Sequence, residues 1–454
     1  MFKYILPLCV AAWPAYGRAE IEPAAPLTLP AALALAAGAN PELSAARHEV
    51  QAVDGAVLQA GLLPNPSLSV ERVDTRRDTR ETTLLLSQPL ELGGKRAARL
   101  QAAERGRDSA TAELALKRAQ VRADVIAAYF AVLAAQEHLR LAREADELAQ
   151  RAAAATARRV VAGKVSPVEE TRARVAASSV QLEAMRAAST LTTARKRLAG
   201  LWGNAAPRFE RAEGAMDVLP TASALGKLGM PGMPGAQGAQ GAHGAQGTLG
   251  VQGALGAQGV AGMPGALADP ANRAALRDRL SRSPAMALAR SQLGRSQALA
   301  QVELSRRAPD LTLNVGSKRS EELGRTQAVF GVSVPLPFFD RNQGNVLESA
   351  RRVDKARDEL AATTLRLDAE LSQACEEFDL ARRQAQALRD DILPGAQSAY
   401  DAASTGFEYG KFGFLDVLDA QRTLLQAKSQ YLNTLAEAHR AMAAIDRILG
   451  VEND

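Results

Sequence analysis

Aromatic side chains are scarce in this 454-residue chain, where Phe, Trp and Tyr together make up only 4% of the residues. The four histidines are scattered, and no H-x-x-H or C-x-x-C spacing occurs. The sequence also lacks a phosphate-binding loop, a nucleophile elbow and a catalytic acid pair. These absences argue against an enzyme, a metal store and a metal sensor, so we expect no cofactor and no resident metal.

Cysteine is nearly absent as well, and its position bears on the compartment. Lys3, a short apolar stretch and the small-x-small site Gly17–Ala19 predict a secretory signal peptide over 1–19. Cleavage after Ala19 would remove Cys9, leave Cys375 alone and exclude an intrachain disulfide. We expect Cys375 to be a packing residue of a helix. The sequence therefore predicts an exported protein without disulfides.

Strong charge and long hydrophobic runs are also missing. The net charge is +5 and would fall to +3 with the loss of Lys3 and Arg18. Arg and Lys are interleaved with Asp and Glu, which disfavours a nucleic-acid partner. After the signal peptide we expect no apolar run near the roughly 20 residues that a membrane helix needs.

A faint repeat divides the chain into two halves. Four pairs of segments match in the same order at offsets of 243 to 250 residues. The paired segments are Asn40–Val70 with Ser283–Val315, Leu84–Gly94 with Phe330–Gly344, Val161–Val175 with Glu408–Leu424, and Arg197–Gly200 with Arg447–Gly450. We predict a first half at 20–221, a Gly-x-y insert at 222–270 and a second half at 271–454. Each half reads helix, strand, strand, long helix, turn, helix.

Long helices dominate the expected fold. A helix over Lys95–Val161 would measure roughly 100 Å at 1.5 Å per residue, and Pro394-Gly395 should interrupt its counterpart. Apolar residues recur at alternating spacings of four and three, as in coiled coils. They are Val121, Val125, Ala128, Val132, Ala135 and Leu139 in the first half, and Leu367, Leu371, Ala374, Phe378, Ala381, Ala385, Leu388 and Ile392 in the second. An ordinary helical bundle would show such stripes too, but its helices would be shorter.

Four strands are expected at about 66–74, 82–90, 310–319 and 326–336. In the second pair, apolar residues alternate with small or polar ones, which is typical of a membrane barrel strand. A half-buried soluble hairpin has the same pattern, but export without a helical anchor favours the membrane. Four strands cannot close a barrel of at least about eight, so several chains would have to share one. The predicted fold class is mainly α with a small β part.

The repeat, "NPEL", the "GK" turns and "LDVLDAQRTLL" resemble the outer-membrane efflux (TolC-like) family over nearly all of the chain outside the insert. Ser87–Glu104 and Pro335–Ala350 are similar to its heavy-metal, cobalt-zinc-cadmium branch. The resemblance implies a homotrimer that forms a twelve-stranded barrel in the outer membrane above a periplasmic helical tunnel. It also implies two partners, a periplasmic adaptor and an inner-membrane pump of the resistance-nodulation-division (RND) type. The expected function is a passive exit duct for divalent heavy-metal cations.

The resemblance also assigns site residues, each of which has a plainer interpretation. Gly163-Lys164 and Gly410-Lys411 match the hairpin tips that meet the adaptor, although any helix hairpin needs such a turn. Asp416 and Asp419 match the aspartates of the pore constriction, although aspartates three apart are more often a solvated face. In a trimer they would form a ring that favours cations.

Two further residues flank these motifs. Glu169 occupies the place of the first tip's acidic residue and is expected to help close the mouth. Phe412 stands where some members have a gating arginine, so closure here is expected to depend on apolar contact.

The Gly-x-y stretch raises the remaining alternatives. Its glycine period runs from Gly226 to Gly265, but only Pro231, Pro234 and Pro264 supply imino acids, fewer than a stable collagen helix needs. We expect a solvated loop between the two halves. A collagen-like structural surface protein is the alternative of another class. A channel that exports drugs or a secreted protein is the alternative within the same fold.

Overall fold

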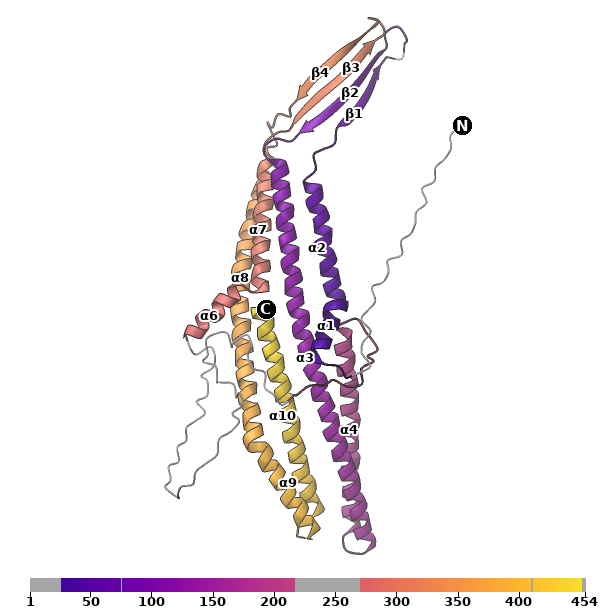
Figure 1. The fold of residues 1–454 in the computed structure, drawn as a ribbon, viewed down its shortest axis with the longest axis vertical. Coiled ribbons are helices and arrows are strands. Elements are labelled where there is room, and N and C mark those ends of the chain that lie inside the picture. Colours follow the sequence, from indigo (N-terminus) through magenta and orange to yellow (C-terminus); the bar gives the residue numbers. More distant parts are fainter. Residues whose placement is uncertain (1–25, 75, 217–269, 410, 451–454) are drawn as a thin grey trace, which may run out of the picture. The chain divides into compact units, whose positions relative to one another are not determined.

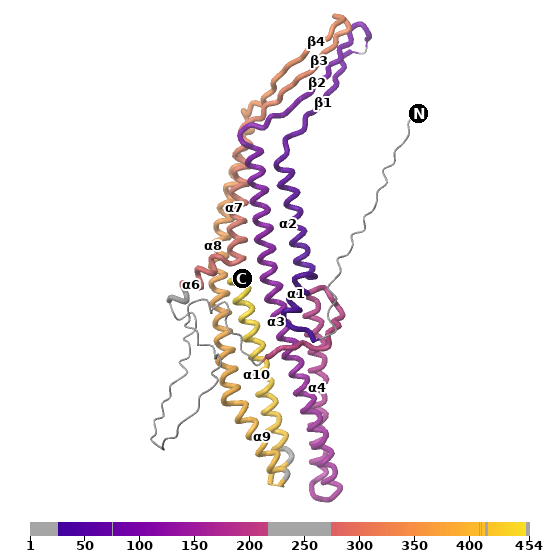
Figure 2. Tube along the Cα trace, in the orientation of Figure 1, coloured from indigo at the N-terminus to yellow at the C-terminus, as the bar shows by residue number. Residues whose placement is uncertain are grey.

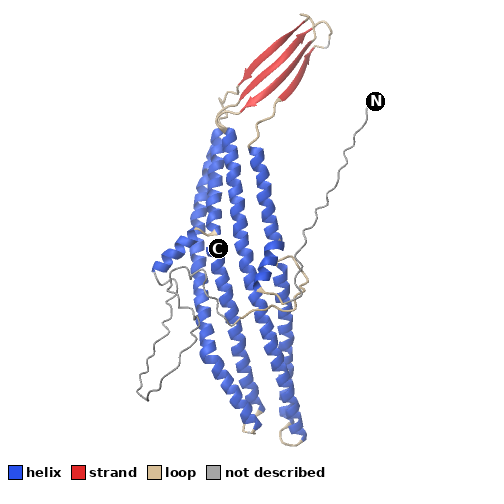
Figure 3. Cartoon of the chain, in the orientation of Figure 1, coloured by secondary structure: helices blue, strands red, loops and turns tan. Residues whose placement is uncertain are grey.

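The computed structural model describes residues 26–74, 76–216, 270–409 and 411–450. The signal peptide, the Gly-x-y insert up to residue 269 and Gly410 lie outside these ranges. The described chain is mainly helical with one small sheet, as the sequence predicts (Figure 3).

Each half contains the six predicted elements in the predicted order (Figure 1). A short helix precedes each set, namely α1 (Leu29–Ala39) and α6 (Pro270–Ser281). The first set is α2 (Pro41–Ala60), β1 (Ser67–Val73), β2 (Glu81–Leu90), α3 (Lys95–Val161) and α4 (Pro167–Gly200). The second set is α7 (Pro284–Ser305), β3 (Leu311–Ser320), β4 (Arg325–Ser333), α8 (Gln343–Ala387), η1 (Leu388–Ile392), α9 (Leu393–Glu408) and α10 (Phe414–Leu449). Here α8, η1 and α9 together take the place of the long helix, and in both sets the turn precedes the last helix.

Matching caps begin the second helix of each half. Asn40 accepts a hydrogen bond from Leu43 N–H at 2.9 Å, and Ser283 accepts one from Met286 N–H at 3.3 Å. A proline follows each cap, and its fixed φ suits the first helical position. The repeated polar-residue-proline pair therefore has a local structural cause.

The chain forms two compact units, and each takes segments from both halves. Unit 1 contains Met1–Ser44, Asp124–Val218 and Gln384–Ala436, and unit 2 contains Ala45–Ala123, Leu219–Arg383 and Glu437–Asp454. This partition follows packing and does not coincide with the sequence repeat. The division into two halves and an insert stays a prediction.

Unit 2 contains a four-stranded antiparallel sheet in the order β1-β2-β3-β4 (Figure 1). Gly316 allows the central strands to approach, since a Cβ there would lie 2.1 Å from the Leu84 carbonyl oxygen. The β4 ladder ends at Ser333, three residues before the predicted end at 336. Its last partner is Thr312, and Pro335 cannot donate a ladder hydrogen bond.

One face of the sheet is apolar and exposed. Leu68, Leu86, Val315 and Phe330 pair across the four strands, so they share a face. All four are exposed, Phe330 to 77%. Leu85 points to the other face, where it pairs with Ser69 and Gly316. The sheet therefore buries neither face in this chain and presents an apolar surface of the kind that lipid covers.

Small and aliphatic side chains form the helical cores. In unit 2, α6, α7, α8 and α10 contribute to a buried cluster that includes Leu371, Cys375, Phe378 and Ile445. In unit 1, α9 and α10 lie side by side (Figure 2). They pack through Ala396, Leu424 and Ala427. Burial raises the pKa of the Cys375 thiol to about 11. Cys375 is thus a packing residue, as expected.

The long helices agree with their sequence signals. The bounds of α3, Lys95–Val161, are those predicted, and its seam residues Val121 to Leu139 are buried. In the second half, a π-helical turn precedes Pro394, and Leu393 N–H donates to the Leu388 carbonyl. This turn accommodates the missing proline N–H and interrupts the helix where predicted. Ile392, predicted on the seam, is instead 49% exposed because the wider turn shifts the helical phase.

One expectation about hydropathy was wrong. By length and composition, α3 contains an 18-residue stretch with few charges that is apolar enough to cross a membrane. Half of that stretch is buried inside the protein, as in the core helix of a soluble bundle. Among the described residues, α3 is the one helix that meets this test.

Candidate functional site

Unit 1 contains both helix-hairpin tips that the sequence singles out (Figure 2). Between α3 and α4, Gly163 has φ +66°, and its N–H donates to the Val160 carbonyl at 2.9 Å. Lys164 N–H donates to the Arg159 carbonyl at 2.9 Å, which completes a Schellman motif. Ser166 then caps α4 by accepting a hydrogen bond from Val168 N–H at 3.3 Å. Glycine is needed here because the left-handed conformation closes the helix.

The tip between α9 and α10 uses the same backbone bond with a different side-chain arrangement. Lys411 N–H donates to the Gly406 carbonyl at 2.8 Å, the counterpart of the bond from Lys164. The Phe412 ring covers Gly406 so closely that a Cβ there would lie 2.0 Å from it. Phe412 is still 50% exposed, so one side of the ring remains free. Lys164 and Lys411 are exposed at their tips, whereas Gly410 lies outside the described residues.

The three candidate acidic residues lie in the first turns that follow these tips. Asp416 is exposed and accepts a hydrogen bond from Gly413 N–H at 2.8 Å, which satisfies a free donor at the start of α10. Asp419 is exposed one turn later. Glu169, half-buried in the first turn of α4, forms an ion pair with Arg172 at 3.2 Å. Asp416 and Glu169 thus also stabilise their own helices.

Sequence reasoning missed a contact that joins the two hairpins. The guanidinium carbon of Arg159, in the last turn of α3, lies 4.3 Å from the centroid of the Phe407 ring in the last turn of α9. This distance is well within the range of a cation–π interaction. The residues are far apart in sequence and belong to no shared motif, so only the packing of the hairpins reveals the pair.

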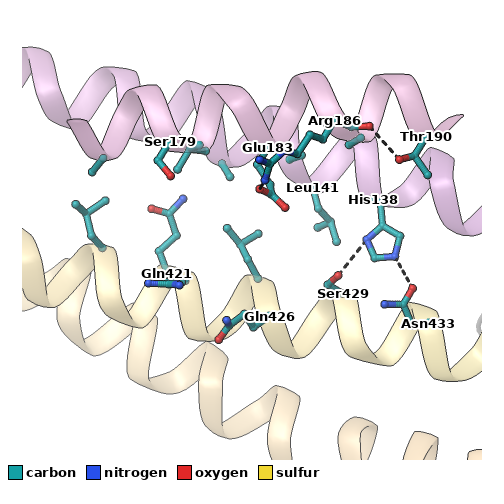
Figure 4. A pocket seen from close by; sticks show the side chains of 18 of the residues that line it. His138, Leu141, Ser179, Glu183, Arg186, Thr190, Gln421, Gln426, Ser429 and Asn433 are labelled. Carbon is teal, nitrogen blue, oxygen red and sulfur yellow. Dashed lines mark hydrogen bonds and ion pairs between the residues drawn. The ribbon is translucent and has the colours of Figure 1, made fainter. Parts of the chain in front are cut away.

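A groove of about 950 Å³ lies farther along unit 1, between α3, α4 and α10. His138 bridges two of these helices, since Nδ1 lies 3.2 Å from the Ser429 hydroxyl and Nε2 lies 3.1 Å from Asn433 Oδ1 (Figure 4). In the tautomer with the proton on Nε2, the ring donates to the Asn433 amide oxygen and Nδ1 accepts from the Ser429 hydroxyl. Asp419 also lines the groove.

No group of three or more His, Cys, Asp or Glu side chains that could hold a metal occurs among the described residues. His138 is engaged with α10, and Cys375 is buried in the core of unit 2. Two carboxylates, Glu183 and Asp419, are among the residues that line the groove of unit 1.

These features define a class of protein. Unit 2 contains an antiparallel sheet with an exposed apolar face, and unit 1 contains two helix hairpins with exposed lysines at their tips. Residues 32–204 and 275–451 match the family described as "Outer membrane efflux protein". The chain belongs to this family of outer-membrane channels, which are transport proteins and not enzymes.

Individual relatives agree with this assignment. The chain is 44% identical to the "Cobalt-zinc-cadmium resistance protein CzcC" of Cupriavidus metallidurans over 94% of this chain and 91% of that one. It is similar in fold to CusC, with a TM-score of 0.70, 17% identity and coverage of 93% and 92% of the two chains. The outer membrane protein VceC of Vibrio cholerae gives a TM-score of 0.69, 17% identity and coverage of 93% and 96%.

The insert has a match of its own. Residues 222–273 match the description "Collagen triple helix repeat (20 copies)". This segment falls between the two parts that match the efflux family. The efflux-family match thus covers residues on both sides of the collagen-like stretch.

Proposed function

We propose that this protein is the outer-membrane exit duct of a tripartite system that expels divalent heavy-metal cations. The observation that carries the proposal is the 44% identity, over nearly the whole chain, to a cobalt-zinc-cadmium resistance protein. The lack of a metal-binding cluster among the described residues is compatible with a duct that conducts cations without storing them. Selection of the metal would then fall to the pump.

The open sheet supports a trimeric assembly. Four strands leave two unpaired edges, which cannot be tolerated in lipid. Three copies would close a twelve-stranded barrel, above the minimum of about eight strands. The apolar face with Leu68 and Phe330 would then contact lipid, and the polar face would line the barrel.

The exposed first turns of α10 support a cation-selective constriction. Three copies of Asp416 and Asp419 would bring up to six carboxylates to the axis, and such rings favour cations. Replacing both by Asn keeps the hydrogen-bond acceptor for Gly413 but removes the charge. In planar bilayers we expect Asp416→Asn/Asp419→Asn to reduce the cation-to-anion permeability ratio severalfold. The control Asp401→Asn alters an exposed aspartate of α9 and should leave the ratio unchanged.

The tips support docking of a periplasmic adaptor that links the duct to an inner-membrane RND pump. Lys164 and Lys411 are exposed on short, tightly bonded turns, where a partner can reach them without unfolding a helix. Gly163 would set the shape of the first turn, whereas Gly410 stays a predicted tip residue outside the described ranges. Glu169 and the free side of Phe412 would contribute to closing the mouth, by charge and by apolar contact respectively.

Deletion of the gene tests the cargo. We expect a strain without this protein, and without a redundant channel, to lose tolerance to zinc, cobalt and cadmium while keeping its tolerance to drugs. Unchanged metal tolerance with new drug sensitivity would favour a drug duct, and loss of a secreted protein would favour a secretion duct.

A second deletion separates the duct from the collagen-like alternative. Removal of 226–267 should leave metal tolerance largely intact if the chain is a duct. Loss of all function would favour a structural surface protein built around the glycine triplets.

A further inference from the structure

At its turn end, the sheet of unit 2 carries positive charge on its apolar face. All four connections to helices leave from one end of the sheet, and both hairpin turns lie at the other. Next to those turns, the register aligns Arg72 with Thr82, Thr82 with Arg319, and Arg319 with Thr326. Residues opposite each other in antiparallel strands share a face. The four therefore form one row, which we call the arginine row.

The arginine row borders the apolar band directly. The next row on the same face holds Val70 and Leu84, and the row beyond it holds the pairs from Leu68 to Phe330. Because the family is one of outer-membrane channels with periplasmic helices, the turn end faces the outer leaflet. The arginine row thus lies at the depth of the outer-leaflet headgroups.

Charge is distributed unequally between the two faces at this depth. On the opposite face, Glu81 is paired with Lys318 at 2.8 Å. The arginine row has no acidic member, and Arg72 is exposed on the apolar face. Arg319 pairs with Glu321 at 3.0 Å, but both side chains are exposed and remain accessible. A phosphate near this row would meet two guanidinium groups and two hydroxyls.

At the turn end of the sheet, the described strands carry no Tyr or Trp at the depth of the arginine row. Membrane barrels usually carry Tyr and Trp at both interfaces, but the strands from Ser67 to Leu90 contain none, and those from Leu311 to Ser333 contain only Phe330. At the other end of the sheet, Phe338 and Phe339 are 69% and 94% exposed. The helix end therefore has its aromatic anchor, whereas the turn end has arginine and threonine instead.

We propose that Arg72, Thr82 and Arg319 bind the phosphorylated headgroup of an outer-leaflet glycolipid. Guanidinium groups bind phosphate through paired N–H donors, and a threonine hydroxyl adds a further donor. Arg72 and Arg319 lie two strands apart, about 10 Å, which their side chains can span to reach one headgroup. The site rests on the outer-membrane location of the family and not on the metal cargo.

The test measures lipid selectivity at the surface of the full-length protein. Wild-type protein is reconstituted in phosphatidylcholine vesicles, and spin-labelled lipid A is compared with its dephosphorylated form by electron paramagnetic resonance. We expect wild type to prefer the phosphorylated lipid. In Arg72→Gln/Arg319→Gln this preference should fall about fivefold for each arginine that is replaced. The control Lys318→Gln/Arg325→Gln removes two charges from the same end but from the other face, and should keep it.

Three further arms make the outcome decisive. Arg72→Lys/Arg319→Lys keeps the charge and should retain most of the preference. Millimolar inorganic phosphate should not compete if the site binds a membrane headgroup. If the Gln variant fails to insert, the preference of wild type should still fall with added salt. Preference that is unchanged in the Gln variant, equally lost in the control or insensitive to salt would overturn the proposal. Metal tolerance of the Gln variant is measured separately. Normal tolerance would show that the proposed export function holds even if the lipid-binding proposal is overturned.

Discussion

At the tip between α3 and α4 the chain reverses through backbone hydrogen bonds and a serine cap, whereas at the tip between α9 and α10 a phenylalanine ring closes over a glycine. Both tips share the bond from a lysine N–H to a carbonyl five residues earlier. The first tip then depends on the conformation of Gly163, and the second on the packing of Phe412 against Gly406. The same hairpin plan has thus been stabilised locally in one half and by a side chain in the other.

The difference bears on which tip can change its shape. A Schellman turn has one backbone geometry, and distorting it breaks two hydrogen bonds. A half-exposed ring can leave Gly406 by rotating about its side-chain bonds while the backbone bond from Lys411 remains. The second half also contains the π-helical turn before Pro394, a break that α3 lacks. We infer that the α9–α10 tip changes its shape more readily than the α3–α4 tip.

The largest effect is expected from Gly406→Ala. The new Cβ would displace the Phe412 ring, at a cost of about 1–3 kcal/mol for overpacking, more than the gain in helix propensity of about 0.5–1 kcal/mol. Hydrogen exchange of peptides covering 406–413 should therefore become faster by about tenfold. In planar bilayers the same variant should show a raised basal conductance.

Gly395→Ala supplies the control within the same helix. A Cβ at Gly395 meets nothing within 4 Å, so the substitution gains helix propensity without displacing a neighbour. In this variant, hydrogen exchange of peptides covering 406–413 should become slower or stay the same. If both variants behaved alike, Phe412 would not be holding the second tip, and the contrast between the tips would be lost.

The fold was largely predictable because its signals are local and repeated. Lys95 to Val161 contains no proline and keeps an apolar seam, which is enough to define α3. The four strands were found near their predicted ranges, since alternation and charged turns mark them. The end of β4 and the exposure of Ile392 were missed, because they depend on where a partner strand stops and on the pitch of a π turn.

The candidate site was predictable only in its position. Motifs located both tips and the aspartates, but they gave no sign that Asp416 bonds its own helix start or that Phe412 covers Gly406. Arg159 and Phe407 meet only because the two hairpins pack together. His138, dismissed as one of four scattered histidines, likewise gains its partners on α10 from tertiary packing.

A smaller effect is expected at the first tip from Gly163→Ala. Residue 163 has φ +66°, which costs a non-glycine residue about 1 kcal/mol, but a Cβ there meets nothing within 4 Å. The turn should keep its hydrogen bonds, and the amide hydrogen exchange of residues 163 and 164 should become about fivefold faster. Gly163→Asn should have a weaker effect, since asparagine tolerates this conformation. If Gly163→Ala lost as much protection from hydrogen exchange as Gly406→Ala, the first tip too would depend on packing.

The smallest effect is expected from Ser166→Ala, which removes the cap of α4. The hydrogen bond from Val168 N–H is long at 3.3 Å and lies at an exposed helix end, so water can replace it. We expect a loss of helix stability near the lower end of the usual range, about 0.5 kcal/mol. It should be seen as a twofold faster amide hydrogen exchange confined to residues 168–170. Ser166→Asp should restore protection, because it keeps an acceptor and adds negative charge at the helix start. If Ser166→Ala instead raised exchange across the whole tip, the cap would be coupled to the Gly163 turn, and the first tip would respond as one unit.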